Sequence, residues 1–185
     1  MLKVFSDANE AGIIGNIQYS VATGLIDHAG MFIDQNGIPK HARKNTNNIP
    51  QKKYTEWSCI TTACCLIKKT VFMQMGGFDE RFQNGCEDID LCLRLREQGY
   101  RCYAANESII YHHISCSPGR NSDNGPNVER FLQKWSGQTI ELAKAKWTLE
   151  YLLRYRRHWW KNKPLESIPG YLPPSVQSQQ SRLRV

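Results

Sequence analysis

The chain has 185 residues, of which 41% are hydrophobic, so it is long enough to form one globular domain with a buried core. Its net charge of +7 comes entirely from the last third, because residues 1–124 carry 13 basic and 13 acidic side chains while residues 125–185 carry 11 and 4. No apolar run approaches the roughly 20 residues of a membrane span, and the first ten residues lack the apolar segment of a signal peptide, which together predict a cytoplasmic protein.

The seven cysteines form neither a metal-ligand pattern nor an even set of pairs. They include no CxxC pair and no Cys/His ligand spacing, which argues against a zinc site and against a disulfide framework. We therefore expect reduced thiols that fill the core as small apolar side chains, as is usual in a cytoplasmic protein.

The first part of the chain predicts strands and a long loop. Residues 10–34 alternate short apolar runs with Gly and Asn, a pattern typical of short strands joined by turns. Residues 35–56 are polar and aperiodic and predict a loop, and loops of that length inside a compact domain are often functional. Residues 57–69, WSCITTACCLIKK, predict one buried strand.

The middle of the chain predicts two helices followed by strand structure. Residues 70–78 indicate a short helix, because the apolar pattern stops at a pair of glycines. Residues 87–100 indicate a second helix, with three acidic residues in its first turn and a glycine near its end. Residues 101–115 predict one or two strands. The fold class that follows is mixed α/β.

The last third predicts a basic helix and a tail. Residues 137–160 indicate a basic amphipathic helix, and residues 161–185, rich in Pro, Ser and Gln, predict a disordered tail. Between residues 144 and 163, Lys and Arg alternate with Trp and Tyr. This segment fits packing on the domain, peripheral contact with a membrane or nucleic-acid binding. No nucleic-acid motif occurs, so no specific nucleic-acid partner is expected.

Glu87, Asp88 and Asp90 place three acids in one turn of the second predicted helix. Acids there commonly cap free N–H groups and complement the helix dipole, for about 0.3–1 kcal/mol each. A cap needs one acid rather than three, and the neighbouring residues 76–82, GGFDERF, add two glycines and two aromatic rings. A carboxylate in such a place can act as a general base when a substrate hydroxyl comes within about 2.6–3.2 Å. Both interpretations stay open at this point.

His112 and His113 follow the apolar pattern of the predicted strand. Successive side chains of a strand point to opposite faces, so the two histidines serve one site together only if the strand has ended. A structural histidine and a histidine that joins carboxylates around a divalent cation are both compatible with the sequence.

Taken in order, these segments resemble the C-terminal half of the catalytic domain of family 2 glycosyltransferases, the GT-A-fold enzymes of the rhamnosyltransferase-like bacterial type. Any one segment alone is a weak match, but five occur in the family's order between about residues 10 and 136. They are IIGNIQYS, LIDHAGMFID, WSCITTACCLIKKTVFMQMGGFDERF, GCEDIDLCLRLREQGYRCYAANESIIYHH and FLQKW. The resemblance implies a partial GT-A fold, a mixed sheet flanked by helices, with residues 1–136 as its acceptor-side half.

The resemblance also implies roles for the matching residues. Asp88 corresponds to the catalytic base, which deprotonates an acceptor hydroxyl for attack on the anomeric carbon with inversion, and Glu87 to a residue that orients the base or contacts the acceptor. His112, with His113 as second choice, corresponds to the histidine near the metal and the diphosphate. The residues implied to line the acceptor pocket are Trp57, Thr62, Gly76, Gly77, Phe78 and Asp79.

By the same resemblance, the partners are a nucleotide-sugar donor, a glycan or lipid-linked acceptor of cell-envelope polysaccharide synthesis, and Mg²⁺ or Mn²⁺. The nucleotide-binding half of the family, which ends in an Asp-x-Asp-type metal motif, has no counterpart at the start of this chain, where Asp7 is followed by Ala8 and Asn9. We therefore expect a fragment without the donor half that exposes strand edges and is marginally stable alone. The alternative is a non-catalytic remnant or an acceptor-binding module.

Overall fold

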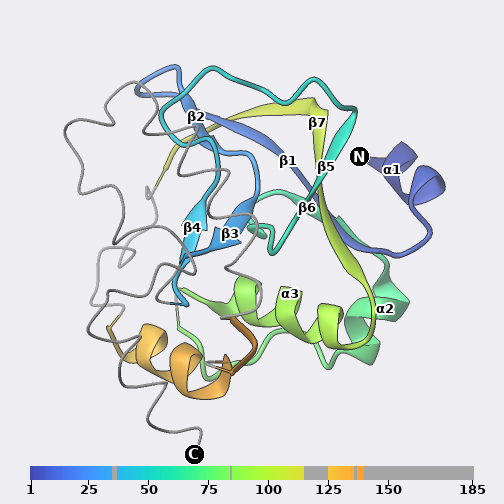
Figure 1. The fold of residues 1–185 in the computed structure, drawn as a ribbon, viewed down its shortest axis with the longest axis vertical. Coiled ribbons are helices and arrows are strands. Elements are labelled where there is room, and N and C mark those ends of the chain that lie inside the picture. The colour runs from blue at the N-terminus through green and yellow to red at the C-terminus, as the bar shows by residue number, and fades with distance from the viewer. Residues whose placement is uncertain (35–36, 84, 115–124, 136, 140–185) are drawn as a thin grey trace, which may run out of the picture.

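The computed structural model describes residues 1–34, 37–83, 85–114, 125–135 and 137–139, and Figure 1 shows how its elements are arranged. The elements in chain order are α1 (Leu2–Asp7), β1 (Ala11–Ser20), β2 (Ile26–His28), β3 (Met31–Ile33), β4 (Pro39–His41), β5 (Tyr54–Trp57), β6 (Cys65–Ile67), α2 (Lys69–Gln74), α3 (Glu87–Glu97) and β7 (Arg101–His112). Residues 125–135 and 137–139 are also helical.

A five-stranded mixed sheet forms the centre of the fold, with the order β2-β1-β7-β5 and with β6 paired to β1. β1 and β7 run parallel along their whole length, from Ala11 opposite Arg101 to Ser20 opposite His112. β2, β6 and β5 join this pair as antiparallel strands, and β3 and β4 form a separate two-stranded sheet. This arrangement confirms the predicted fold class, a mixed α/β partial GT-A fold.

The main core joins the sheet to α3, which lies along one side of it in Figure 1. The leucines of α3, at positions 91, 93 and 95, are almost fully buried, and Phe131 and Trp135 from the helical residues 125–135 belong to the same core. A smaller cluster packs Val4 and Ala8 at α1 against Ile14 and Tyr103. The helix 125–135 is therefore part of the domain core, which places it beside the start of α3.

The prediction of one buried strand over residues 57–69 is wrong. β5 ends at Trp57 and pairs with β7, whereas β6 begins at Cys65 and pairs with β1. Between them the chain crosses from one strand partner to another, and Cys59 and Ile60 are fully buried on the way. The apolar run reflects the burial of this connection, and burial alone does not distinguish a strand from a buried loop.

Other predicted boundaries shift as well. Residues 10–34 form three strands joined by turns, as predicted, although β1 is longer than expected at 10 residues. The predicted loop over residues 35–56 contains β4 and the start of β5. β7 is one strand of 12 residues whose register with β1 shifts next to Asn16, so that Ala105 and Ile109 pair with successive residues of β1. The helices α2 and α3 confirm the predictions from the glycine signals.

Most of the predicted basic helix, beyond residue 139, and the whole predicted tail of residues 161–185 lie outside the described residues. Of the helices in the described ranges, none combines the length and the apolar content needed to cross a bilayer. Cys59, Cys92 and Cys102 are buried in the core, where their thiols pack with the apolar side chains around α3.

Candidate functional site

The three acids at the start of α3 have different partners. Asp90 is 0% exposed, and its carboxylate binds three groups. Arg94 Nε lies 2.8 Å from Oδ2, while Lys134 Nζ and Trp135 Nε1 lie 2.7 and 2.9 Å from Oδ1. Both oxygens are thus engaged by protein groups, so Asp90 joins α3 to the helix 125–135 rather than facing a ligand.

Asp88 lies beside the connection between β5 and β6. Its Oδ2 accepts a hydrogen bond from the backbone N–H of Thr62 at 3.4 Å, and its Oδ1 accepts one from the N–H of Ile89 at 2.8 Å. The N-cap residue Cys86 makes no side-chain cap bond and has a left-handed φ of 71°. Asp88 therefore serves one N–H of the first helical turn, as the cap interpretation holds, and also reaches a second segment of the chain.

The Asp88 carboxyl is a stronger base than an ordinary aspartate. Burial is the largest cause that raises the pKa of Asp88 to about 6, and the nearby Cys92 sulfur and Glu87 carboxylate act in the same direction. Hydrogen bonds from Thr61 and Thr62 oppose this rise. A carboxylate with such a pKa is mainly ionised at neutral pH and still accepts a proton readily, which suits general-base catalysis. Glu87, which precedes Asp88, has a buried Oε2 atom without a hydrogen-bond partner.

The predicted acceptor turn, residues 76–79, is built on two glycines in the left-handed region, with φ of 76° and 71°. Phe78 is 42% exposed, and its ring meets Phe72 edge-on at a centroid distance of 5.2 Å. Asp79 is bound by Arg81, with Nη2 at 2.7 Å, and by Lys134 at 3.2 Å. The Arg81 guanidinium, together with Lys134, holds the pKa of Asp79 well below its usual range.

Trp57 lies in the core and is 3% exposed. Its ring packs directly on Gly30, where an added Cβ would come within 2.1 Å of a ring carbon. Of the residues predicted to line the acceptor pocket, Thr62 thus lies next to Asp88 and Phe78 is partly exposed, whereas Trp57 is buried in the core. Their contact with an acceptor stays a prediction.

His112 ends β7, and its Nδ1 atom is buried without a hydrogen-bond partner, while His113 is exposed. Sequence reasoning missed a second imidazole in this region. His28 on β2 is 0% exposed, both of its ring nitrogens lack partners, and its ring meets His41 edge-on at 5.1 Å. Burial lowers the pKa of His28 well below its usual value, and His41, His112 and Lys44 lower it further.

The signal for His28 was present in the segment LIDHAGMFID, which supplies β2 and β3. The sequence does not show which strand β2 pairs with. The structure sets His28 opposite Gln18 on one edge of β1, and His112 opposite Ser20 on the other edge. Both histidines therefore lie near the carboxyl end of β1.

The described residues do not form the predicted metal site by themselves. No group of three His, Cys, Asp or Glu side chains within the described ranges is placed to hold a metal ion. His112 Nδ1 is a nitrogen donor without a protein partner, which fits one ligand position but not a complete set. Its role as a metal ligand stays a prediction.

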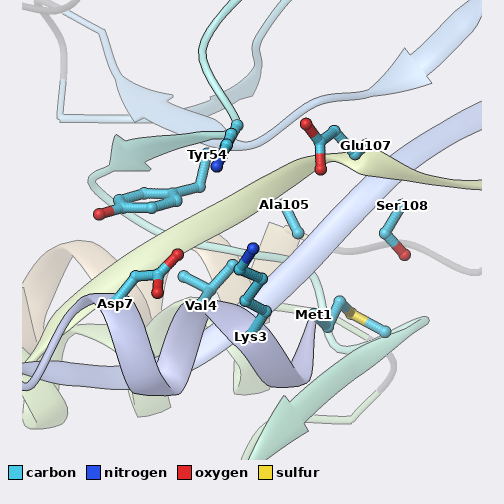
Figure 2. A pocket seen from close by; sticks show the side chains of 9 residues that line it. Met1, Lys3, Val4, Asp7, Tyr54, Ala105, Glu107 and Ser108 are labelled. Atoms are coloured by element: carbon cyan, nitrogen blue, oxygen red, sulfur yellow. The ribbon is translucent and has the colours of Figure 1, made fainter.

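A pocket of about 220 Å³ lies between α1 and the strands β5 and β7 (Figure 2). Its lining side chains carry both signs of charge, and none of the predicted site residues is among them. They are Met1, Lys3, Val4, Asp7, Lys53, Tyr54, Ala105, Glu107 and Ser108. The geometry around the start of α3, rather than this pocket, carries the candidate chemistry.

Known proteins share the segments that build this site. Residues 42–115, which include Asp88 and β7, match the family described as the N-terminal domain of galactosyltransferase. The chain is 32% identical over 130 residues to the O-antigen biosynthesis protein RfbC of Myxococcus xanthus, which covers 66% of this chain and 10% of that protein. It is 33% identical over 72 residues to the N-acetylglucosaminyl-diphospho-decaprenol L-rhamnosyltransferase of Mycobacterium tuberculosis, covering 39% and 23%.

A third relative is the uncharacterized protein y4gI of Sinorhizobium fredii, which is 30% identical over 131 residues, or 67% of this chain and 14% of that protein. The chain thus spans between a tenth and a quarter of the length of each of these relatives. The family match over residues 42–115 includes β5, β6, α2, α3 and β7.

Proposed function

We propose that this chain, which belongs to the family 2-like glycosyltransferases, supplies the acceptor side of a glycosyl transfer. In that reaction a sugar moves from a nucleotide-sugar donor to a saccharide or lipid-linked acceptor, with inversion at the anomeric carbon. The observation that carries the proposal is the environment of Asp88. Burial is the main cause that raises the pKa of its carboxyl to about 6, yet the residue is partly exposed at the N-terminus of α3. These are the properties of a general base.

In the proposed reaction, Asp88 takes the proton of an acceptor hydroxyl as that oxygen attacks the anomeric carbon of the donor. The new glycosidic C–O bond forms while the bond to the diphosphate oxygen breaks, and the nucleoside diphosphate leaves. The N–H of Thr62 holds one carboxylate oxygen of Asp88 in place. Glu87, whose Oε2 atom has no protein partner, is placed to orient the base or bind the acceptor.

The names of the relatives support the acceptor class. One relative is named for O-antigen biosynthesis, and another for transfer to a decaprenol-linked sugar. We infer that this chain also serves cell-envelope polysaccharide synthesis. The proposal includes Mg²⁺ or Mn²⁺, for which the described residues offer His112 as one ligand, and it places the remaining ligands and the nucleotide site outside these residues. Peripheral membrane contact through residues 144–163 belongs to the same proposal.

A second candidate is an acceptor-binding module or remnant without activity of its own. The observation in its favour is that the described residues contain the proposed base and the proposed acceptor turn but no group of three side chains placed to hold a metal ion. Calorimetric titration of the isolated chain with UDP- and dTDP-sugars tests the placement of the donor site, which both candidates share. We expect no tight binding, and a tight complex would contradict the placement of the donor site outside these residues.

The decisive variant is Asp88→Asn in a protein or complex that contains this chain and shows transfer. We expect the transfer rate to fall at least about 100-fold, because proton removal is lost, while donor affinity stays the same. Glu80→Gln is the matched control, since Glu80 is an exposed acid near the same turn. Full activity of the Asp88→Asn protein would remove Asp88 as the base.

The membrane part of the proposal is tested by sedimentation with liposomes. Binding that requires anionic lipid, and that is lost when the basic residues between 144 and 163 are replaced by glutamine, supports peripheral contact. Equal binding to random RNA indicates general attraction between cations and polyanions instead.

A further inference from the structure

Lys134 connects two parts of the candidate site that are distant in sequence. Its Nζ atom lies 2.7 Å from Asp90 Oδ1 and 3.2 Å from Asp79 Oδ2. Asp79 ends the two-glycine turn of the acceptor side, and Asp90 lies two residues after Asp88 in the first turn of α3. One ammonium group therefore bridges the turn and the helix that carries the base.

A second connection runs through the other oxygen of Asp90. Arg94 pairs with this oxygen at 2.8 Å, and the same guanidinium donates hydrogen bonds to the backbone carbonyls of Met75 and Gly77, the latter at 2.8 Å. The turn is thus tied to α3 at both of its ends by charge-assisted hydrogen bonds, which are the stronger class. Buried Asp90 is the common anchor of both connections.

The helix that carries Lys134 is itself firmly placed. Phe131 and Trp135 are buried in the main core, and the indole N–H of Trp135 donates to Asp90 at 2.9 Å. Arg130 Nη1 donates to the carbonyl of Arg81 at 2.6 Å. The backbone of Lys134 is therefore held in place by the core packing of its helix, so its ammonium group can fix the position of the turn.

Of residues 75–86, by contrast, those that the structure describes (75–83, 85 and 86) belong to no helix or strand. Two successive glycines at positive φ give this segment little conformational preference of its own. Its position relative to α3 depends on contacts with other parts of the fold. These include the bonds of Lys134 and Arg94 to the turn, the bonds of Arg130 and Asn127 to the backbone of Arg81 and Gln83, and the burial of Phe82 in the main core.

We propose that Lys134 is a positioning residue that holds the acceptor turn, residues 76–79, at a set distance from the base Asp88, acting through Asp79 and Asp90. The roles of turn and base rest on the function proposed above, whereas the bridge itself rests on the contacts alone. This explains the motif FLQKW: its Phe and Trp pack the helix into the core, and its Lys contacts Asp79 of the turn.

Hydrogen exchange followed by mass spectrometry on the full chain tests the bridge without any ligand. In Lys134→Met, which keeps the apolar stem and removes the charge, we expect exchange of the amides of residues 76–83 to accelerate at least about tenfold. Lys134→Arg should restore protection, and Lys69→Met, at an exposed lysine on α2, should change nothing. Unchanged exchange in Lys134→Met would overturn the proposal.

Equal acceleration in β1 and β7 would also overturn it, because Lys134 would then serve general stability. If Lys134→Met does not fold, Asp79→Asn replaces it, since this variant weakens the contact with the turn and leaves Asp90 paired with Lys134. The same local acceleration is expected there, and its absence counts against the bridge.

In a transfer-competent protein, Lys134→Met should raise the acceptor KM at least about tenfold while the donor KM stays within twofold. An unchanged acceptor KM contradicts the positioning role. This readout separates the two proposals: retained activity in Asp88→Asn removes the assigned base, whereas the exchange data judge the bridge on their own.

Discussion

Asp88 Oδ2 lies 3.4 Å from the backbone nitrogen of Thr62, although the two residues are 26 positions apart in the chain. The contact exists because the connection between β5 and β6 crosses the start of α3 on its way from one strand partner to the other. It links the predicted base to a residue predicted on the acceptor side, and it places the carboxyl where burial raises its pKa.

Asp88→Asn should stabilise the fold at neutral pH. The carboxyl pKa of about 6 in the folded state lies above the ordinary aspartate value of 3.8, so folding favours the protonated form. Protonation of Asp88 stabilises the folded state fully below pH 3.8, and this contribution is lost as the pH rises through 6. The loss in unfolding free energy is at most about 3 kcal/mol. Asparagine loses nothing over this range, so the advantage of the variant should grow between pH 4 and 6 and then stay constant.

Urea denaturation at intervals between about pH 4 and pH 8 measures this difference, with Glu80→Gln as the control that should show no such trend. An Asp88→Asn protein that is less stable than the unchanged chain at pH 8 would contradict the burial of a charged carboxylate. Together with lost transfer, a stabilised variant would mark Asp88 as a residue kept for function at a cost in stability.

His28 should make the chain sensitive to mild acid. Its pKa is lowered in the folded state, mainly by burial, so the unfolded chain takes up a proton below about pH 6.5 while the folded chain does not. Unfolding therefore becomes easier as the pH falls through this range, by up to about 1.4 kcal/mol per pH unit. In His28→Gln this dependence should be absent, and His113→Gln, at an exposed histidine, should keep it.

The measurement is the difference in unfolding free energy between each variant and the unchanged chain at pH 5, 6 and 7. Because Asp88 contributes a trend of opposite sign in part of this range, the comparison with His28→Gln isolates the histidine. Parallel pH profiles for His28→Gln and the unchanged chain would show that His28 takes up its proton equally well in both states.

Gly30→Ala should be among the most damaging single changes in the chain. Gly30 has a φ of +122°, and an added Cβ would lie 2.1–2.4 Å from three atoms of the Trp57 ring, which is itself buried. Because the Trp57 ring is buried in the core and the φ of Gly30 disfavours any side chain, we expect a loss of at least about 3 kcal/mol. Gly24→Ala, with φ of +66° and open space around it, should cost about 1–2 kcal/mol. Thermal and urea unfolding give both values, and similar losses for the two variants would argue against the close packing of Gly30 on Trp57.

Cys64 should be the first of the six described thiols to be alkylated. Cys59, Cys92 and Cys102 are buried, and burial raises the pKa of the partly exposed Cys65 and Cys86 to about 11. Since the thiolate is the reactive form, both should react slowly at neutral pH. Timed labelling with iodoacetamide and peptide mapping gives the order. Faster labelling of Cys65 or Cys86 than of Cys64 would contradict the raised pKa of these two thiols.

Local features of this fold could be predicted from the sequence because their causes are local. The helices α2 and α3 follow from apolar spacing and from glycines that adopt positive φ after them, at positions 76, 77 and 99. The predicted mixed α/β class and the order of motifs between residues 10 and 136 come from the same kind of pattern. Asp88 entered as a candidate because it lies in such a motif.

The sequence therefore determined the segment from Gly76 to Tyr100 as the place of the candidate chemistry, and the tertiary structure decided which side chains act there. Three acids within four positions look equivalent in sequence, yet Asp90 is bound by Lys134 and Trp135 from 44 and 45 positions away, whereas Asp88 contacts Thr62. Trp57 and His28 are likewise buried by strands whose pairing no local pattern specifies. The physical reason is that propensity and periodicity act over one or two turns of chain, while burial, hydrogen-bond partners and pKa depend on neighbours brought in by the fold.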